Sequence, residues 1–382
     1  MRIAARKIIG GRKQWFLIAL GVLLTPFSLV SRANSQQPPF VAYGASASVQ
    51  EIVAVRFTSV GGKLASVIVQ REPLGFEAAP VVFHAQYRLL YVASLRAKEV
   101  DGNKLLVFSV GKDGRLTRKK EVELPHGSAY LSLDRSGRFL LSASYFEGHV
   151  DIHRLDVQGI PTTLVGTNYE GRDKAHSIRT TRDNRFAYVP YVKDRNALYQ
   201  YAFDEKSGKL LALDPPQANV PTGIGPRHVA YHPTEPFVYF SNEQHLGAIA
   251  YRIQRGGTLQ LLQVCQPGDL KPAEGLAASD ILITPDGLFL YVGVRDFDKG
   301  LVDAIHRYAV SPDGTLTHLG QTKSDAIPWG LQLSPDGRHL LVTATNGGTL
   351  TAFEITTDGD LAKRTSIGWG KMIRAIAVVE VE

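Results

Sequence analysis

Four side chains of the sequence carry groups suited to acid–base chemistry on an anionic substrate: His176, Arg227, Glu243 and Arg295. An imidazole or a carboxylate transfers protons when it lies against the reacting group. The planar guanidinium of arginine binds carboxylate or phosphate through two hydrogen bonds and stabilises a developing oxyanion. The sequence therefore indicates a cationic acid–base site, provided that the fold brings these residues together.

The elements that would position them belong to an internal repeat of about fifty residues. Each copy has an apolar strand, a polar turn and a second strand rich in aliphatic and aromatic residues. Two copies use Pro-Asp-Gly as the turn, in which proline presets φ and glycine accepts a positive φ. The second strands are aligned on Leu89, Phe139, Phe186, Phe237, Phe289 and His339, with spacings of 50, 47, 51, 52 and 50 residues.

Two further strands complete each copy, for example residues 304–310 and 315–320. Four antiparallel strands per copy, without helical periodicity, are typical of a β-propeller blade. Residues 40–70 supply the last three strands of a seventh blade, and residues 373–379 supply its first strand, which would close the ring. The sequence thus predicts an all-β, seven-bladed β-propeller as a single domain over residues 34–382. A tandem of two β-sandwiches is the alternative.

Propeller geometry decides which polar residues can meet. The first strand of a blade lines the central channel and the second returns antiparallel to it, so the start of one and the end of the other share a face. Sites commonly form at such a face. The unusual residues at strand starts are His176, Arg227, His228, Asp280 and Arg374. Those at the ends of second strands are Tyr145, Tyr191, Lys193, Glu243, Arg295, Asp296 and Asn346.

Structural roles remain an alternative for part of this set. Arg227 and Arg295 could be ordinary channel-lining residues that pair with Glu243 and Asp296. His228 directly follows Arg227 in a strand whose side chains alternate between two faces. We therefore expect the His228 ring to face away from the channel and to pack between blades.

The first 33 residues have the composition of an export signal. They contain six basic residues and no acidic one, and residues 15–30 are uncharged and mostly apolar. Ser31-Arg32-Ala33 places small residues at positions −3 and −1 of a cleavage site. We predict a signal peptide at residues 1–33 and an exported chain, periplasmic or secreted, without stable membrane insertion after cleavage. An uncleaved membrane anchor is the alternative.

Charge and cysteine content exclude several classes of protein. The net charge is +7, and setting aside the six basic residues of the first 33 leaves +1, so nucleic acid is not an expected partner. Cys265 is the only cysteine, which excludes an internal disulfide and a cysteine-based zinc site. The sequence contains no nucleophile elbow, zincin motif or phosphate-binding loop. We expect a monomer that needs no metal and no cofactor.

One stretch of the sequence resembles a known enzyme family. Residues 223–233, Gly-Ile-Gly-Pro-Arg-His-Val-Ala-Tyr-His-Pro, and residues 240–243, Phe-Ser-Asn-Glu, resemble the propeller-type lactonases, as do residues 175–177 and 280–287. That family includes seven-bladed bacterial 6-phosphogluconolactonases and the fungal carboxy-cis,cis-muconate lactonizing enzyme. The resemblance covers residues 75–380. One departure is Trp329, which follows a proline where many members have an arginine.

The resemblance implies a lactonase that hydrolyses a sugar-type lactone, as 6-phosphogluconolactonase does, with His176, Arg227, Glu243 and Arg295 as catalytic residues. Glu243 would be the general base, the arginines would bind the oxyanion and the substrate's anionic group, and His176 would return the proton. Alternatively, Glu243 only orients Arg227. The candidate substrate-binding residues are His228, Tyr145, Tyr191, Asn242, Trp329 and Asn346.

Two other functions stay open at this point. One is an exported propeller that binds a peptide or glycan at the channel mouth without chemistry. The other is a muconate-type cycloisomerase that uses the same residues to form or open a lactone. In each case the partner is a small molecule or a ligand held at the channel mouth.

Overall fold

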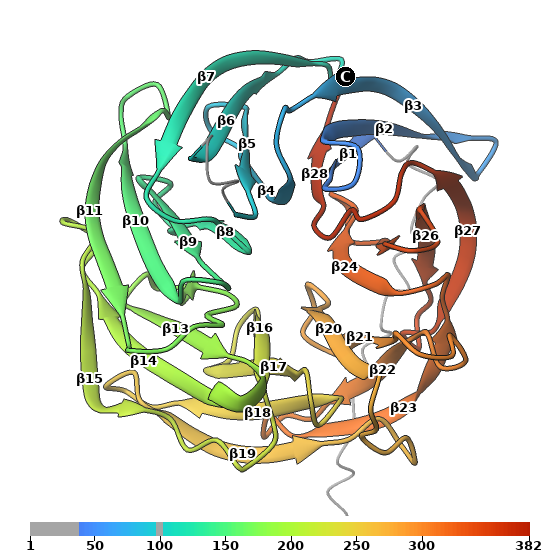
Figure 1. The fold of residues 1–382 in the computed structure, drawn as a ribbon. Helices are drawn as coiled ribbons and strands as arrows, with labels where there is room; N and C mark the ends of the chain where they lie inside the picture. The colour runs from blue at the N-terminus through green and yellow to red at the C-terminus, as the bar shows by residue number, and fades with distance from the viewer. Residues whose placement is uncertain (1–37, 97–101) are drawn as a thin grey trace, which may run out of the picture. The chain divides into compact units, whose positions relative to one another are not determined.

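The computed structural model describes residues 38–96 and 102–382, which form seven four-stranded antiparallel sheets arranged in a ring (Figure 1). We number the sheets as blades 1–7. Blade 1 contains β28 (Ala377–Glu380), β1 (Phe40–Ser46), β2 (Glu51–Val60) and β3 (Lys63–Pro73). Blade 2 contains β4 (Ala78–His84), β5 (Leu89–Ser94), β6 (Asn103–Val110) and β7 (Leu116–Leu124). Blade 3 contains β8 (Tyr130–Leu133), β9 (Phe139–Ala143), β10 (His149–Leu155) and β11 (Pro161–Tyr169).

The remaining blades repeat this arrangement. Blade 4 contains β12 (Arg179–Thr180), β13 (Phe186–Tyr191), β14 (Ala197–Phe203) and β15 (Leu210–Gln217), with the 3-10 turn η1 (Lys193–Arg195) before β14. Blade 5 contains β16 (Pro226–Tyr231), β17 (Phe237–Asn242), β18 (Ala248–Ile253) and β19 (Leu259–Cys265). Blade 6 contains β20 (Leu276–Ile283), β21 (Phe289–Asp296), β22 (Ala304–Val310) and β23 (Leu316–Lys323). Blade 7 contains β24 (Pro328–Leu333), β25 (His339–Ala344), β26 (Thr349–Ile355) and β27 (Leu361–Gly368).

This architecture confirms the predicted seven-bladed propeller and excludes the two-sandwich alternative. Each of the six residues used to align the repeat begins the second strand of a blade. The predicted closure is also present, because β1 pairs with β28 from Phe40 opposite Glu380 to Tyr43 opposite Ala377. Blade 1 is therefore built from both ends of the described chain.

A close approach of backbone to side chains supports the closure. A Cβ on Gly44 of β1 would lie 2.5 Å from Ile373 Cγ2 and 2.6 Å from Trp369 Cη2. Trp369 and Ile373 are fully buried and pack with residues of blades 1 and 7. Only glycine leaves room for this contact, which ties β1 to the segment leading into β28.

Buried tyrosines join neighbouring blades at four points. Each tyrosine lies on a second strand and donates its hydroxyl to the carbonyl of a glycine with positive φ in the next blade. The four bonds are Tyr43 to Gly114 at 2.5 Å, Tyr91 to Gly159 at 2.6 Å, Tyr188 to Gly257 at 2.7 Å, and Tyr291 to Gly359 at 2.6 Å. Burial raises the pKa of these hydroxyls, which keeps them protonated as donors. The repeat thus fixes blade-to-blade geometry as well as blade structure.

Residues 1–33, where the sequence predicts a signal peptide, lie outside the described residues. Within residues 38–96 and 102–382, no helix is both long enough and apolar enough to cross a membrane.

Candidate active site

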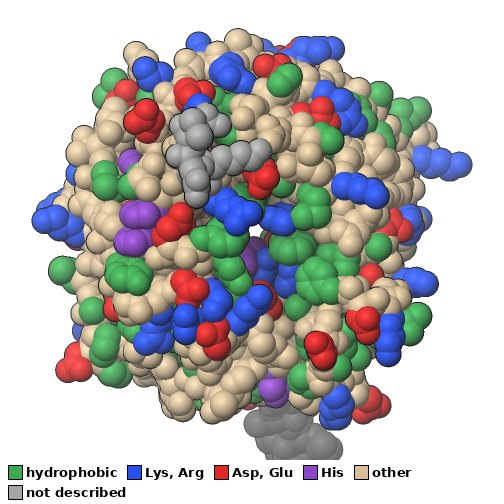
Figure 2. Space-filling view, viewed as in Figure 1, with side chains coloured by type: hydrophobic (Ala, Val, Ile, Leu, Met, Phe, Trp, Pro, Cys, Tyr) green, Lys and Arg blue, Asp and Glu red, His purple; other side chains and the backbone are tan. Residues whose placement is uncertain are grey.

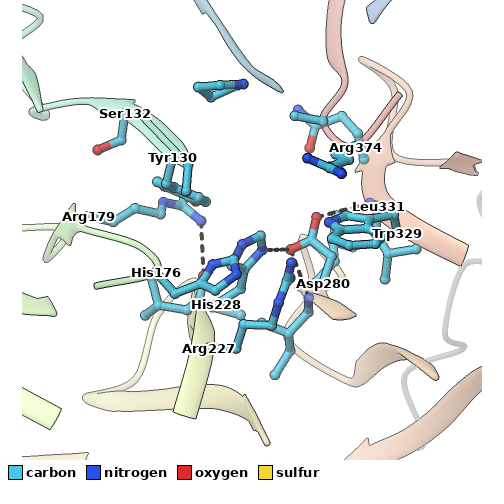
Figure 3. A pocket seen from close by; sticks show the side chains of 18 of the residues that line it. Tyr130, Ser132, His176, Arg179, Arg227, His228, Asp280, Trp329, Leu331 and Arg374 are labelled. Carbon is cyan, nitrogen blue, oxygen red and sulfur yellow. Dashed lines mark hydrogen bonds and ion pairs between the residues drawn. The ribbon is translucent and has the colours of Figure 1, made fainter. Parts of the chain in front are cut away.

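The central channel contains a cavity of about 990 Å³ lined by residues from the first strands of the blades. Figure 2 shows a hollow at the centre of one face of the molecule, bordered by basic and hydrophobic side chains. Figure 3 shows several of the lining residues pointing toward one another across this space. We call the end of the cavity where the first strands begin the channel mouth.

A carboxylate and two buried arginines form the centre of the mouth. Pro226 of β16 pairs with Asn242 of β17, and this register brings Arg227 beside Glu243. Arg227 Nε donates to Glu243 Oε2 at 3.0 Å, and Arg295 NH2 lies 3.7 Å from the same oxygen. The exposed fraction of these side chains is 1% for Arg227, 2% for Arg295 and 10% for Glu243. The predicted cluster is therefore present, with one carboxylate shared by two guanidinium groups.

Both guanidinium groups keep hydrogen-bonding capacity for a ligand. Among the described residues, Arg227 NH1 and Arg295 Nε are buried and have no hydrogen-bond partner. Burial, together with the charge of Arg227, lowers the pKa of Arg295 to about 9, against the opposing effect of Glu243. Burial also lowers the pKa of Arg227. Unpaired buried donors of this kind are costly, and an anionic ligand would satisfy them.

Trp329 of β24 packs against three guanidinium groups at once. Its ring centroid lies 4.2 Å from Arg295 Cζ, 5.1 Å from Arg374 Cζ and 5.5 Å from Arg227 Cζ. Such cation–π contacts strengthen when water is excluded. The residue that departs from the family pattern thus holds the cationic groups in place.

His228 contradicts the prediction that its ring packs away from the channel. The register of β16 and β17 shifts between Pro226 and Val229, and such a bulge breaks the alternation of side chains. His228 therefore lines the cavity together with Arg227. Its Nδ1 lies 2.7 Å from Asp280 Oδ1, while Nε2 is buried and has no hydrogen-bond partner among the described residues (Figure 3).

Backbone N–H groups donate hydrogen bonds to Asp280 and so fix the orientation of the His228–Asp280 pair, which we call the dyad. Its Oδ2 accepts from Leu331 N at 3.0 Å and its Oδ1 accepts from Ile281 N at 2.9 Å. These bonds and His228 lower the pKa of Asp280, although burial opposes them. Burial, followed by the charge of Arg227, lowers the pKa of His228 to about 4. His228 is therefore neutral at pH 7, and its buried Nε2 is left without a hydrogen-bond partner among the described residues.

His176 lies between this dyad and the arginine cluster. Its Nε2 lies 4.0 Å from Glu243 Oε2, and its ring centroid lies 5.0 Å from that of His228. Burial and the nearby Arg227 lower the pKa of His176 well below its usual value, so this ring is also neutral. Tyr145 packs edge-on against His176 at 5.6 Å, where it forms part of the cavity wall.

Several predicted residues lie outside the cavity. Tyr191 is buried and donates its hydroxyl to Gly148 O at 3.3 Å. Asn242 is buried and Asn346 is exposed, and neither lines the cavity. Asp296 accepts backbone N–H groups of the loop that follows it and makes no ion pair with Arg295.

Sequence reasoning missed two aromatic residues of the wall. Tyr130 packs edge-on against His228 at 5.0 Å, and Phe297 packs against Trp329 at 6.1 Å. Tyr130 begins a first strand, so the rule based on strand starts would have found it if it had been applied to every blade. In the described parts of the chain, no three His, Cys, Asp or Glu side chains are grouped so that they could hold a metal ion.

Comparison with known proteins identifies the family. Residues 41–371 match the family described as "Lactonase, 7-bladed beta-propeller". The chain belongs to this lactonase family. The confirmed fold and the resemblance read from the sequence therefore agree.

Solved structures of similar shape include lactonase-like propellers. A periplasmic gluconolactonase of Pseudomonas aeruginosa is 22% identical, with a TM-score of 0.78 over 90% of this chain and 100% of that one. A putative 6-phosphogluconolactonase of Bacteroides fragilis is 19% identical, with a TM-score of 0.78 over 90% of this chain and 98% of that one. A protein of Lactobacillus plantarum is 20% identical, with a TM-score of 0.76 over 90% and 100% of the two chains. At these identities the likeness is one of fold.

Proposed function

We propose that this member of the family hydrolyses a hydroxylated sugar-type lactone at the channel mouth. The observation that carries the proposal is the neutral, carboxylate-backed His228 beside two buried arginines with unpaired N–H groups. A lactonase needs a base for water, donors for the oxyanion and a proton for the leaving alkoxide. Membership of the family supports the same chemistry.

In this proposal His228 takes the role of general base that the sequence suggested for Glu243. His228 Nε2 accepts a proton from water as the water oxygen attacks the lactone carbonyl carbon. Arg227 and Arg295 stabilise the resulting oxyanion. The ring C–O bond then breaks, and the proton on His228 passes to the leaving alkoxide, which yields the hydroxy acid.

Glu243 serves in this scheme to hold both arginines, because one of its oxygens lies within 4.0 Å of each guanidinium. His176, which the sequence suggested as the proton donor, stays neutral and positions the Glu243 carboxylate. Asp280 keeps the His228 Nδ1 proton in place so that Nε2 is free to act, as in other carboxylate–histidine pairs.

Gluconolactone and its 6-phosphate are the substrates we favour. The cavity presents arginines for an anionic or polyhydroxylated ligand, with Tyr145 and Trp329 as aromatic walls. We also propose that the chain acts after export, which is supported by its leader-like first 33 residues and by its likeness to a periplasmic gluconolactonase.

A pH-stat screen of the mature protein against glucono-1,5-lactone, its 6-phosphate and muconolactone tests this proposal. We expect acid release well above the spontaneous rate with a gluconolactone. Arg227→Gln should lower turnover about 100-fold or more, because it removes an oxyanion donor. Arg252→Gln is the matched control, since Arg252 of β18 stacks on Phe237 and does not line the cavity.

Two results would contradict the proposal. Binding of the lactones without acid release would favour a binding propeller. Conversion of muconolactone to muconate, without hydrolysis of a gluconolactone, would favour a cycloisomerase.

A further inference from the structure

A second group of arginines lies at the opposite end of the channel. The first strands begin at the mouth, and their far ends lead into the turns that carry Arg135, after β8, and Arg182, after β12. Arg179 lies within β12 itself. All three line the same cavity as Arg227. Figure 3 shows Arg179 beside the labelled Tyr130, across the pocket from Arg374.

The internal repeat shows that these turn arginines are local substitutions. In the turn that joins the first and second strands of a blade, the position equivalent to Arg135 and Arg182 is proline in blades 5, 6 and 7 and alanine in blade 2. These residues are Pro233, Pro285, Pro335 and Ala85. Only the adjacent blades 3 and 4 carry arginine there. Because Pro233 and Pro285 also line the cavity, the position faces the channel, and the two substitutions concentrate charge on one side of it.

Nothing within ion-pairing distance balances this charge. In the part of the chain that the structure describes, none of Arg135, Arg179 and Arg182 has a guanidinium nitrogen within 4.0 Å of a carboxylate oxygen. Arg135 Nε donates only to a backbone carbonyl, that of Thr181, at 3.4 Å, and Arg179 NH1 donates to Val229 O at 3.3 Å. The group therefore resembles the mouth in charge but lacks an anion comparable to Glu243.

The nearest acidic side chains are committed elsewhere. Asp134 accepts from Asn184 Nδ2 at 2.8 Å and from Ser136 Oγ at 2.5 Å. Asp183 accepts from Thr181 Oγ1 at 2.6 Å and pairs with Arg185. Burial and the charge of Arg179 lower the pKa of Arg135, which is consistent with cations that repel one another.

The two turn arginines, Arg135 and Arg182, lie too far from Arg227 for one small sugar lactone to reach both levels, whereas Arg179, which donates to Val229 O, lies between them. On β16, Arg227 lies near the start of the strand at the channel mouth, and Tyr231 is the last residue before the far turn. The four residues from Arg227 to Tyr231 span about 13 Å of strand. A six-carbon lactone held by Arg227 would not reach the far turns. A ligand held by Arg135 and Arg182 is therefore a separate molecule.

We propose that Arg135, Arg179 and Arg182 form a second anion site, which binds a phosphate-type oxyanion independently of the channel mouth. Guanidinium groups bind tetrahedral phosphate through paired hydrogen bonds, and three of them match its charge and its several acceptor oxygens. The exposure of the two turn arginines leaves this end of the channel open to a small solute.

Isothermal titration with inorganic phosphate, at ionic strength held constant with sodium chloride, tests the site. The double variant Arg135→Gln/Arg182→Gln should weaken phosphate binding at this site at least tenfold. The matched control is Arg138→Gln/Arg185→Gln, which removes the same charge from the same two turns. Arg138 instead donates to Glu205 O at 2.7 Å, and Arg185 stacks on Phe186, so neither lines the channel.

A mouth variant separates this site from the active site. Arg374→Gln should keep the phosphate affinity that the far double variant loses. Equal phosphate binding by the far double variant and its matched control would overturn the proposal, whatever the lactone turnover. A parallel titration with citrate distinguishes phosphate from carboxylate ligands, and preference for citrate would overturn the phosphate assignment.

Discussion

Replacing Glu243 with glutamine tests whether one carboxylate holds both mouth arginines. The substitution keeps the shape and one acceptor oxygen but leaves Arg227 and Arg295, which are 1% and 2% exposed, without a compensating charge. Breaking a buried ion pair by removing one partner costs about 3–5 kcal/mol, and the retained acceptor places Glu243→Gln near the lower value. For a domain of about 350 residues, a loss of about 3 kcal/mol lowers the Tm by about 4 °C.

Differential scanning calorimetry at pH 7 measures this effect. The control is Glu354→Gln, which removes the same charge from a half-exposed pair with Arg364. Exposed pairs contribute under about 1 kcal/mol, so the control should shift the Tm by about 1 °C or less. A Glu243→Gln protein with the same Tm as the control would refute the view that Glu243 anchors the two arginines.

Two further predictions concern ring closure and pH. Gly44→Ala should lower the Tm in a thermal melt, because the added Cβ meets Ile373 and Trp369 at 2.5–2.6 Å, whereas Gly256→Ala, with no atom within 4 Å, is the control that should melt like the parent. The kcat/KM for the lactone, corrected for spontaneous hydrolysis, should be level between about pH 5 and 8. It should fall as pH drops through the His228 pKa of about 4, because protonation removes the base, and fall again as pH rises through the Arg295 pKa of about 9, because the guanidinium loses its charge. A constant kcat/KM down to pH 3 would contradict the role of His228.

The sequence was sufficient to predict the architecture, because its repeat is regular and because residues such as Pro-Asp-Gly favour a turn at the same place in the repeat. The spacing of Leu89, Phe139 and the later repeats required four strands per blade, and the strand-like ends of the chain required closure. The same geometry predicted that Arg227 and Glu243 would meet. The two residues are sixteen positions apart, at the start of one strand and the end of its antiparallel neighbour.

The orientation of His228 could not be predicted from alternation, because a bulge in β16 overrides it. Similar register shifts occur in β20 and β24, where they bring Asp280 and Trp329 into the same site. Tyr191 also ends a second strand, but it does not line the cavity, because its buried hydroxyl donates to Gly148 O. Local backbone irregularity, rather than the repeat, decides the placement of His228, Asp280 and Trp329.

The measurement that tests the central claim most directly is kcat for His228→Gln on the most active gluconolactone. Loss of a general base lowers turnover by about 100-fold to 10,000-fold. Asp280→Asn should lower kcat in the same direction while KM changes little, because it disturbs the tautomer of His228. His318→Gln, on the outer strand β23, should retain the parent value. We predict at least a 100-fold loss for a folded His228→Gln protein; a folded variant with the parent kcat would contradict the proposed mechanism.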